Sequence, residues 1–179
     1  MDKVSFIKWI YPATKGLEIN GIFTTAQAAL ESGWGTSSIG NNIFGITKGS
    51  SWNGAVELVT TTEYFSTDKV SFKLPERVLS IMPFKNKKGV TKYKYKVKRL
   101  FRQYDTIVEC LKDHESILKK PIYADAWPYR NDPEEFAKKI VDSVGGKYAT
   151  ALDYADNLKS IIRDIRKIID TTSDTENEK

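Results

Sequence analysis

The sequence contains very little of what proteins use to build cross-links and metal centres. Its 179 residues include one cysteine, Cys110, and one histidine, His114. A single cysteine cannot form an internal disulfide, and this pair supplies too few ligands for a zinc cluster. We therefore expect no metal and no cofactor. The two residues lie four apart in one predicted helix, whereas a cysteine-peptidase pair comes from different segments, so we interpret them as core residues.

Long apolar runs are also absent. Lys8 and Pro12 interrupt the apolar residues at the start of the chain, so no stretch there resembles the ~7–15-residue centre of a signal peptide. No later run approaches the ~18–20 apolar residues of a membrane helix. We expect a soluble chain without membrane insertion, either kept in a cytoplasm or exported with its signal removed.

Aromatic residues and positive charge are plentiful. Hydrophobic residues make up 40% of the chain and include 8 Phe, 9 Tyr and 4 Trp, which is enough for the core of one domain. The net charge is +5, and since residues 170–179 carry four acids and one lysine, the rest holds about +8. A protein this basic usually meets an anionic partner, such as nucleic acid, a membrane surface or a cell wall.

Local patterns predict a helical start and a β-rich middle. We expect a short helix capped by Asp2 and a second helix capped by Thr24 or Thr25 and ended by Gly33. A loop rich in Gly, Ser and Asn follows over 35–54.

Residues 55–104 contain β-branched and aromatic runs that predict four short strands in two hairpins, over 56–65, 69–74, 77–84 and 89–101. Within 92–98, lysine alternates with Tyr93, Tyr95 and Val97, the period of a strand with one lysine face.

The remaining chain is predicted to be helical. We expect helices over 106–120 after Asp105, from Asp132 to Gly145, and over about 152–169. The fold class is therefore α+β, with one domain over 1–169 and an acidic, disordered tail over 170–179.

Glu31 is the first candidate for chemistry. It lies at the carboxyl end of a short helix, where the helix dipole disfavours negative charge and, with shielding by Trp34, raises its pKa. A carboxylic acid that stays protonated near neutral pH can act as a general acid. Spacing alone favours the other interpretation, an exposed glutamate at a frayed helix end.

The surrounding stretch AQAALESGWGTSSIGNNIFGIT (26–47) closely resembles the catalytic segment of glycoside hydrolase family 73, the bacterial and phage endo-β-N-acetylglucosaminidases. In that family the glutamate of the ESGWG run, here Glu31, is the catalytic acid, and the NNIFG element with Asn42 and Phe44 follows it. Further matches occur in the family's order: TTEYF (61–65), FRQY (101–104), DHESIL (113–118) and YATALDYADNL (148–158).

The resemblance covers roughly residues 3–165 and implies a lysozyme-like fold with a helical lobe, a small antiparallel β lobe and a cleft between them. It implies that Glu63 is the second acidic residue and that Tyr148 lines the active site. It also assigns substrate contacts to four residues: Trp34, Asn42, Phe44 and Tyr64. Trp34, Trp52 and Trp127 each carry two interpretations, as a sugar-stacking platform or as a buried anchor.

Two features depart from the family's pattern. Ala151 and Leu152 replace the usual Asp-Pro of the closing motif, and residues 66–100 form a longer connection than is usual. The segment 85–102 holds nine basic residues and no acid, which is typical either of a solvated strand face or of a surface that binds an anionic polymer. We expect no nucleic-acid partner, since no nucleic-acid-binding motif accompanies it.

The resemblance implies a peptidoglycan hydrolase that cleaves the β-1,4 bond on the reducing side of N-acetylglucosamine in glycan strands. A muramidase or a lytic transglycosylase is the alternative among enzymes, because these share the fold and one essential glutamate. A catalytically silent wall-binding or virion module is the alternative from another class. In either setting the protein acts at the cell wall, as a phage lysin or virion component or as an exported protein.

Overall fold

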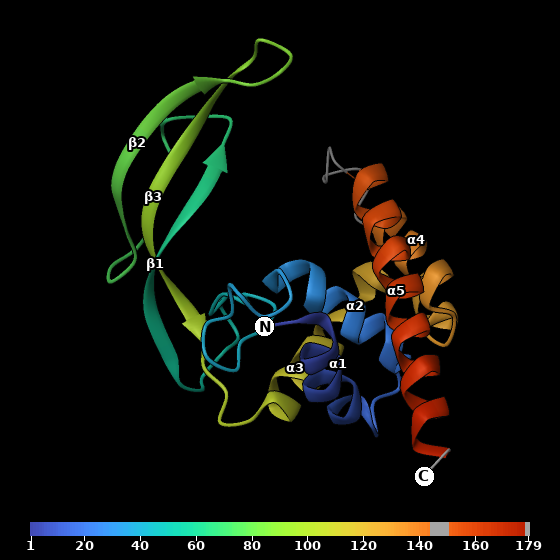
Figure 1. The fold of residues 1–179 in the computed structure, drawn as a ribbon. Helices are drawn as coiled ribbons and strands as arrows, with labels where there is room; N and C mark the ends of the chain where they lie inside the picture. The colour runs from blue at the N-terminus through green and yellow to red at the C-terminus, as the bar shows by residue number, and fades with distance from the viewer. Residues whose placement is uncertain (144–150, 178–179) are drawn as a thin grey trace. The chain divides into compact units, whose positions relative to one another are not determined.

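The computed structural model describes residues 1–143 and 151–177, and the chain divides into two compact units (Figure 1). The helical unit comprises residues 1–44 and 104–179, and the sheet unit comprises residues 45–103. The helical unit holds α1 (Lys3–Ile10), α2 (Gly21–Ser32), α3 (Ile107–Leu118), α4 (Pro133–Ser143) and α5 (Ala151–Asn177). The sheet unit holds β1 (Val56–Phe65), β2 (Arg77–Lys85) and β3 (Thr91–Arg102). No helix within 1–143 or 151–177 is long and apolar enough to cross a membrane.

The first two helices begin at residues whose side chains accept backbone hydrogen bonds. Asp2 caps α1 by accepting the Ser5 N–H, as the sequence predicted. The cap of α2 is Asn20, which accepts the Ile22 N–H, so the prediction of Thr24 or Thr25 was wrong. Thr25 instead lies inside the helix and donates its hydroxyl to the Gly21 carbonyl. A threonine side chain can either cap a helix or form this internal bond, and the residue type alone does not decide between them.

Helices α3 and α4 start close to their predicted positions. Thr106, one residue after the expected Asp105, caps α3 in a reciprocal arrangement with Glu109. Asp132 starts α4 as predicted, since its carboxylate accepts the Glu135 N–H. The expected stop at Gly145 lies outside the described residues.

Helix α5 is longer than the sequence predicted. It continues through residue 177, so residues 170–177 are helical and the prediction of disorder from residue 170 was wrong there. Leu158, Ile162 and Ile165 lie on one face of α5 and are completely buried. This apolar stripe packs α5 against α2 and α4, and the helix extends beyond the packed part.

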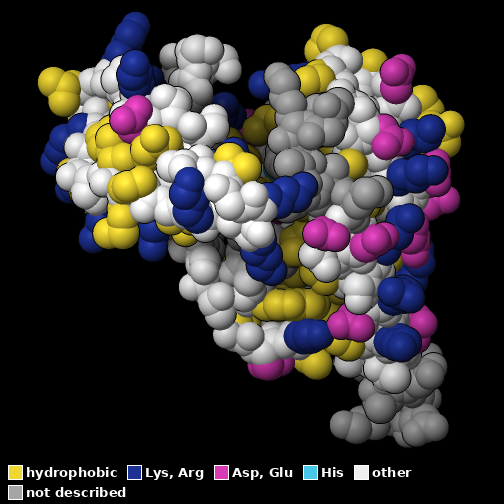
Figure 2. All heavy atoms as spheres, turned by 90° about the horizontal axis from the view of Figure 1, so that it is seen from above, with side chains coloured by type: hydrophobic (Ala, Val, Ile, Leu, Met, Phe, Trp, Pro, Cys, Tyr) yellow, Lys and Arg dark blue, Asp and Glu magenta, His cyan; other side chains and the backbone are white. Residues whose placement is uncertain are grey.

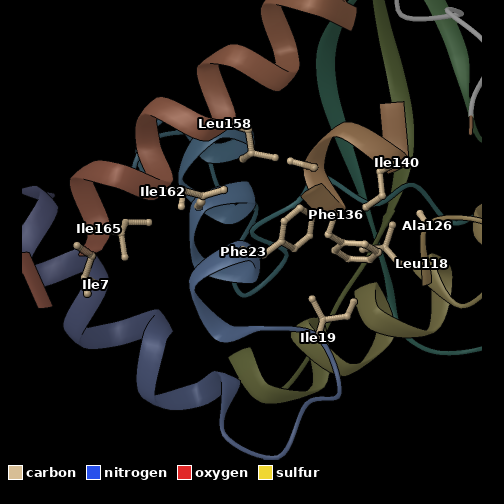
Figure 3. Close-up of a cluster of buried hydrophobic side chains, with 12 residues drawn as sticks. Ile7, Ile19, Phe23, Leu118, Ala126, Phe136, Ile140, Leu158, Ile162 and Ile165 are labelled. Atoms are coloured by element: carbon tan, nitrogen blue, oxygen red, sulfur yellow. The ribbon is translucent and has the colours of Figure 1, made fainter. Parts of the chain in front are cut away.

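The core of the helical unit forms where α2, α4 and α5 meet (Figure 3). Phe23 of α2 and Phe136 of α4 have ring centroids 4.7 Å apart, and Leu158 and Ile162 cover them from α5. Burial of each such side chain stabilises the fold by about 1.5–3 kcal/mol. This packing fixes α2 and α5 beside each other.

The sheet has three antiparallel strands in the order β1-β3-β2, not four strands in two hairpins. β2 and β3 form a hairpin, and β3 also pairs with β1 from Tyr93 to Arg102. The expected strand at 69–74 is absent because this segment crosses the sheet face. The Tyr95 hydroxyl accepts the Val70 N–H at 3.3 Å and donates to the Thr67 carbonyl at 2.8 Å.

The predicted alternation in β3 is confirmed. Tyr95 and Val97 are buried, and Tyr95 contacts the crossing segment, whereas Lys94 and Lys96 point to the opposite, exposed side. We call the side chains of Lys92, Lys94, Lys96 and Lys98 the lysine face.

Candidate functional site

Glu31 is the penultimate residue of α2, as the sequence predicted. The helix ends because Gly33 adopts a left-handed conformation, with φ of 56°. Although solvent reaches the side chain, burial by the surrounding protein raises the pKa of the Glu31 carboxyl above its ordinary value. A hydrogen bond from Tyr154 opposes this shift. The predicted direction is therefore confirmed, and burial is its main cause.

A chain of hydrogen bonds holds the Glu31 carboxylate. The Tyr154 hydroxyl of α5 donates to Glu31 Oε1 at 3.0 Å, and Gln27 Nε2 donates to the same hydroxyl at 3.0 Å. Gln27 and Glu31 lie one helical turn apart, so their side chains share one face of α2. The three residues connect α2 to α5 at the candidate acid.

Sequence reasoning did not identify Gln27 and Tyr154 as site residues. Sequence patterns place Tyr154 only within the predicted helix over about 152–169. It is, however, the second tyrosine of the segment YATALDYADNL, and this position was the signal that could have identified it.

The turn after Glu31 is held tightly by hydrogen bonds. Ser32 donates its hydroxyl to the Ala28 carbonyl at 2.6 Å and accepts the Gly35 N–H at 2.8 Å. Trp34 has φ of 57°, which is rare for a large residue and costs roughly 1–3 kcal/mol. Its ring packs edge-on against Phe6, with centroids 5.6 Å apart. These contacts hold the Trp34 indole in place, and Trp34 follows Glu31 by three residues in the sequence.

The other two candidate tryptophans pack within their own units. The Trp52 indole donates to the Ala55 carbonyl and lies beneath the Arg102 guanidinium. Trp127 is partly buried and packs against Phe136 at the edge of the helical core. Its packing agrees with the anchor interpretation, although its ring is not fully buried.

Asn42 and Phe44 lie in the loop after α2, and Phe44 attaches this loop to α3. Asn42 is buried, and its backbone pairs with that of Ile39. The Phe44 ring stacks on the His114 ring with centroids 3.7 Å apart. Both side chains are therefore engaged inside the helical unit.

Cys110 and His114 have the properties of core residues. Burial raises the pKa of the Cys110 thiol to about 11, so it stays protonated. Burial lowers the pKa of His114 to about 3, so the ring is neutral. Within the described part of the chain, no cluster of three or more histidine, cysteine or acidic side chains could hold a metal ion.

Glu63 lies on β1 in the sheet unit and is engaged in an ion pair. Both of its carboxylate oxygens accept hydrogen bonds from Arg99 Nη1, each at 2.9 Å. Tyr64 points to the opposite face of β1, where it is 61% exposed and contacts the Phe84 ring. Glu63 and Tyr64 therefore do not share a surface of the sheet. Tyr148 lies outside the described residues.

The structure thus forms two groups, each within one unit. The helical unit brings Glu31, Gln27 and Tyr154 together. The sheet unit brings Glu63 and Arg99 together, and these join Glu76.

Comparison with known proteins relates the chain to one family. The family described as mannosyl-glycoprotein endo-beta-N-acetylglucosaminidase (Glucosaminidase) matches residues 8–167. Peptidoglycan hydrolase FlgJ of Escherichia coli (strain K12) is 33% identical over 158 residues, which are 84% of this chain and 41% of that protein. The protein of the same name from Salmonella typhimurium is 31% identical over 175 residues, 92% of this chain and 46% of that protein. The chain therefore spans less than half the length of these relatives.

Solved structures show the same relationship. The glycoside hydrolase domain of Salmonella typhimurium FlgJ matches with a TM-score of 0.71 and 27% identity, covering 99% of this chain and 97% of that domain. A peptidoglycan hydrolase from Sphingomonas sp. A1 matches with a TM-score of 0.60 and 25% identity, covering 94% of each chain. These similarities confirm the predicted α+β, lysozyme-like fold.

Proposed function

Because the chain belongs to the glucosaminidase family, we propose that it is a peptidoglycan hydrolase that cleaves the β-1,4 bond on the reducing side of N-acetylglucosamine. The observation that carries this proposal is the environment of Glu31. Its carboxyl has a raised pKa, lies at a helix end and is oriented by Tyr154. A general acid for glycoside hydrolysis needs these properties.

Glu31 is the residue that protonates the departing oxygen. The Tyr154 hydroxyl binds Oε1, which leaves the other carboxyl oxygen to carry the proton toward the glycosidic oxygen. As the C1–O bond breaks, the sugar develops oxocarbenium character, and the proton neutralises the leaving alkoxide. The aglycone departs as an alcohol, and Glu31 is left ionised.

Glu63 is the second acidic residue of the reaction and acts as the base or as an electrostatic stabiliser of the developing positive charge. If a water attacks C1, Glu63 accepts its proton and the configuration inverts. If the acetamido oxygen of the substrate attacks first, Tyr148 positions that group and the configuration is retained. The resemblance supports both residues in these roles.

The substrate is the glycan strand of the cell wall, where the protein acts as a phage lysin or virion component or as an exported enzyme. Support comes from the similarity to peptidoglycan hydrolases and from the basic composition, which suits a wall that carries carboxylate groups. We expect neither nucleic acid nor membrane insertion.

Analysis of the reaction products tests the bond and the reaction together. Purified walls are digested, reduced with borohydride and analysed by mass spectrometry, and N-acetylglucosaminitol is expected at the new ends. Muramitol ends would establish a muramidase, and anhydro-muramic ends a transglycosylase. Intact walls after treatment with folded protein would support the silent module.

A further inference from the structure

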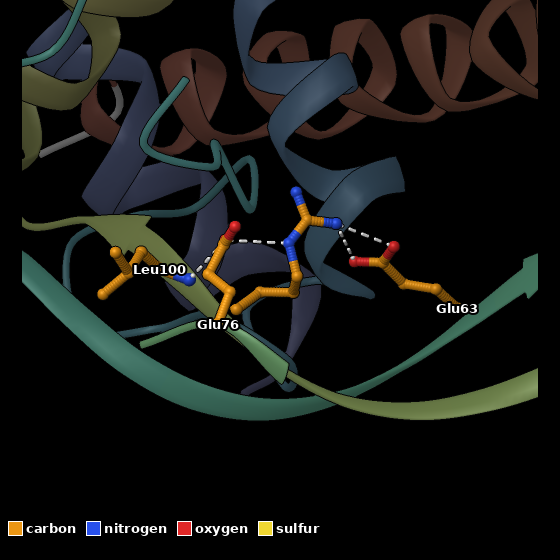
Figure 4. Close-up of polar contacts among 4 residues, drawn as sticks. Glu63, Glu76 and Leu100 are labelled. Atoms are coloured by element: carbon orange, nitrogen blue, oxygen red, sulfur yellow. Dashed lines mark hydrogen bonds and ion pairs between the residues drawn. The ribbon is translucent and has the colours of Figure 1, made fainter. Parts of the chain in front are cut away.

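Three charged side chains form one connected group on the sheet (Figure 4). Arg99 of β3 binds both oxygens of Glu63 on β1 through Nη1, and its Nε donates to Glu76 Oε1 at 2.8 Å. Glu76 directly precedes β2, so the group joins three separate parts of the sheet unit. One guanidinium between two carboxylates leaves a net charge of −1.

Arg99 is fixed on several sides. Its guanidinium lies over the Phe72 ring, 4.5 Å from the centroid, and its side chain is only 19% exposed. Arginine suits this position because its planar group presents several N–H donors at fixed angles to two acceptors at once. A lysine ammonium is a single flexible point charge and does not reproduce this geometry.

Glu76 is held by a backbone hydrogen bond in addition to its contact with Arg99. Its Oε1 also accepts the Leu100 N–H at 2.9 Å. Burial opposes ionisation of Glu76, but the hydrogen bonds from Leu100 and Arg99, together with the positive charges of Arg99 and Lys48, outweigh burial and lower the pKa of the carboxyl. Glu76 therefore remains charged at neutral pH and keeps its hold on Arg99.

Both residues that restrain Arg99 belong to the long connection between TTEYF and FRQY. Phe72 and Glu76 lie within residues 66–100, as Arg99 itself does. This segment therefore supplies the arginine that binds Glu63 together with the aromatic ring and the counter-charge that hold the arginine in place.

We propose that Arg99 and Glu76 are positioning residues that hold the Glu63 carboxylate in the orientation its reaction requires. The proposal rests on the function proposed for Glu63 and assigns a role to the connection over residues 66–100. Arg99 Nη1 uses only part of the hydrogen-bonding capacity of the carboxylate, which has about four lone-pair directions. The remaining directions serve a water molecule or the charge that develops on the sugar.

A double-mutant cycle tests the positioning role. Turnover of a soluble, uncross-linked glycan fragment is measured for Arg99→Lys, Glu63→Gln and the double variant. Arg99→Lys should lower kcat roughly 10-fold to 100-fold with little change in KM, because small misplacements of a reacting group have effects of this size. In the Glu63→Gln background the same change should have no further effect. Glu76→Gln should lower kcat less than Arg99→Lys.

Arg77→Lys on β2 is the matched control, because Arg77 contacts the Pro75 carbonyl and no carboxylate in the described chain. It should retain full turnover. Equal losses from Arg99→Lys in both backgrounds would overturn the proposal, since Arg99 would then act independently of Glu63. Full activity of Glu63→Gln is a different result and would remove the role of Glu63 itself. If Arg99→Lys melts below the assay temperature, the same cycle is run with Glu76→Gln.

Discussion

The Tyr154 hydroxyl lies 3.0 Å from Glu31 Oε1 and donates a hydrogen bond to it, which connects the last helix to the candidate acid. The bond has two opposing consequences. It orients the carboxyl, and it favours the ionised form that burial disfavours. Tyr154 therefore limits how far burial raises the pKa of Glu31.

Removing the acid should abolish most of the activity without harming the fold. Glu31→Gln keeps the shape of the side chain but cannot donate a proton, so wall lysis should fall at least ~100-fold, the low end for general acid catalysis. Turbidity loss of a wall suspension measures the rate, and circular dichroism confirms the fold. Near-normal lysis by folded Glu31→Gln protein would remove Glu31 as the acid.

Glu31→Gln should also reveal the raised pKa of the Glu31 carboxyl, through the pH dependence of the free energy of unfolding. A group whose folded pKa exceeds its unfolded pKa contributes stability below the unfolded value, and this stability is lost as pH rises through the folded value. The stability of the wild-type chain relative to Glu31→Gln should therefore fall as pH rises from below the ordinary value of 4.5. Chemical denaturation across this range measures the difference, and a flat difference would contradict the raised pKa.

Tyr154→Phe should change the pH dependence of turnover. Loss of the hydroxyl removes the hydrogen bond that lowers the pKa of Glu31, so the pKa should rise further and the alkaline limb of kcat should move to higher pH. The loss of orientation should also lower the maximum kcat. Tyr129→Phe is the control, because its hydroxyl makes no hydrogen bond to a described residue and its profile should be unchanged. An unshifted limb in Tyr154→Phe would show that the bond does not affect the acid.

The sequence predicted the position of Glu31 at the end of α2 correctly because a short segment defines it. The glutamate, the helix end at Gly33 and the following motif are contiguous, so local patterns were sufficient. Tyr154 and Arg99 were missed because their roles depend on partners far along the chain, at separations of 123 and 36 residues. Composition and period assign such residues to a helix stripe or a strand without showing what they contact.

The errors in the fold have the same origin. Residues 69–74 alternate as a strand does, but tertiary contacts with Tyr95 direct the segment across the sheet. Asn20 and Thr25 are both good helix caps by type, and only the path of the chain decides between them.

The corrected helix start is itself testable. Asn20→Ala should lower the free energy of unfolding by about 0.5–2 kcal/mol, because the Ile22 N–H loses its acceptor. Thr25→Ser keeps a hydroxyl toward the Gly21 carbonyl and serves as the comparison at the position that the sequence favoured. Urea denaturation measures both variants. A larger loss for Thr25→Ser than for Asn20→Ala would contradict the assigned cap.

Tyr148→Phe should lower turnover while the melting temperature stays nearly unchanged, with a smaller loss than Glu63→Gln. The phenol hydroxyl is the only group removed, so the loss reports its role in positioning the substrate. Single-turnover kinetics on a soluble glycan fragment provide the measurement. Full activity of Tyr148→Phe would separate this tyrosine from the reaction.

The lysine face carries the last prediction. Its lysines form no ion pair within the part of the chain that the structure describes, and the exposed apolar side chains of Tyr64 and Met82 flank Lys94 across the sheet. Figure 2 shows yellow and dark-blue side chains intermingled on the sheet unit. Such a surface suits an anionic wall polymer, because exposed charges attract it over the ~8–10 Å of the screening length.

Changing Lys92, Lys94 and Lys96 to Gln should therefore weaken wall binding and flatten its dependence on salt. A control with the same loss of charge changes three exposed lysines of the helical unit: Lys112, Lys120 and Lys138. If binding depends on the lysine face, only the first variant should lose affinity in a wall pull-down across a salt series. Equal losses in the two variants would indicate an effect of net charge alone, and an unchanged salt response would identify the lysine face as a solvated strand surface.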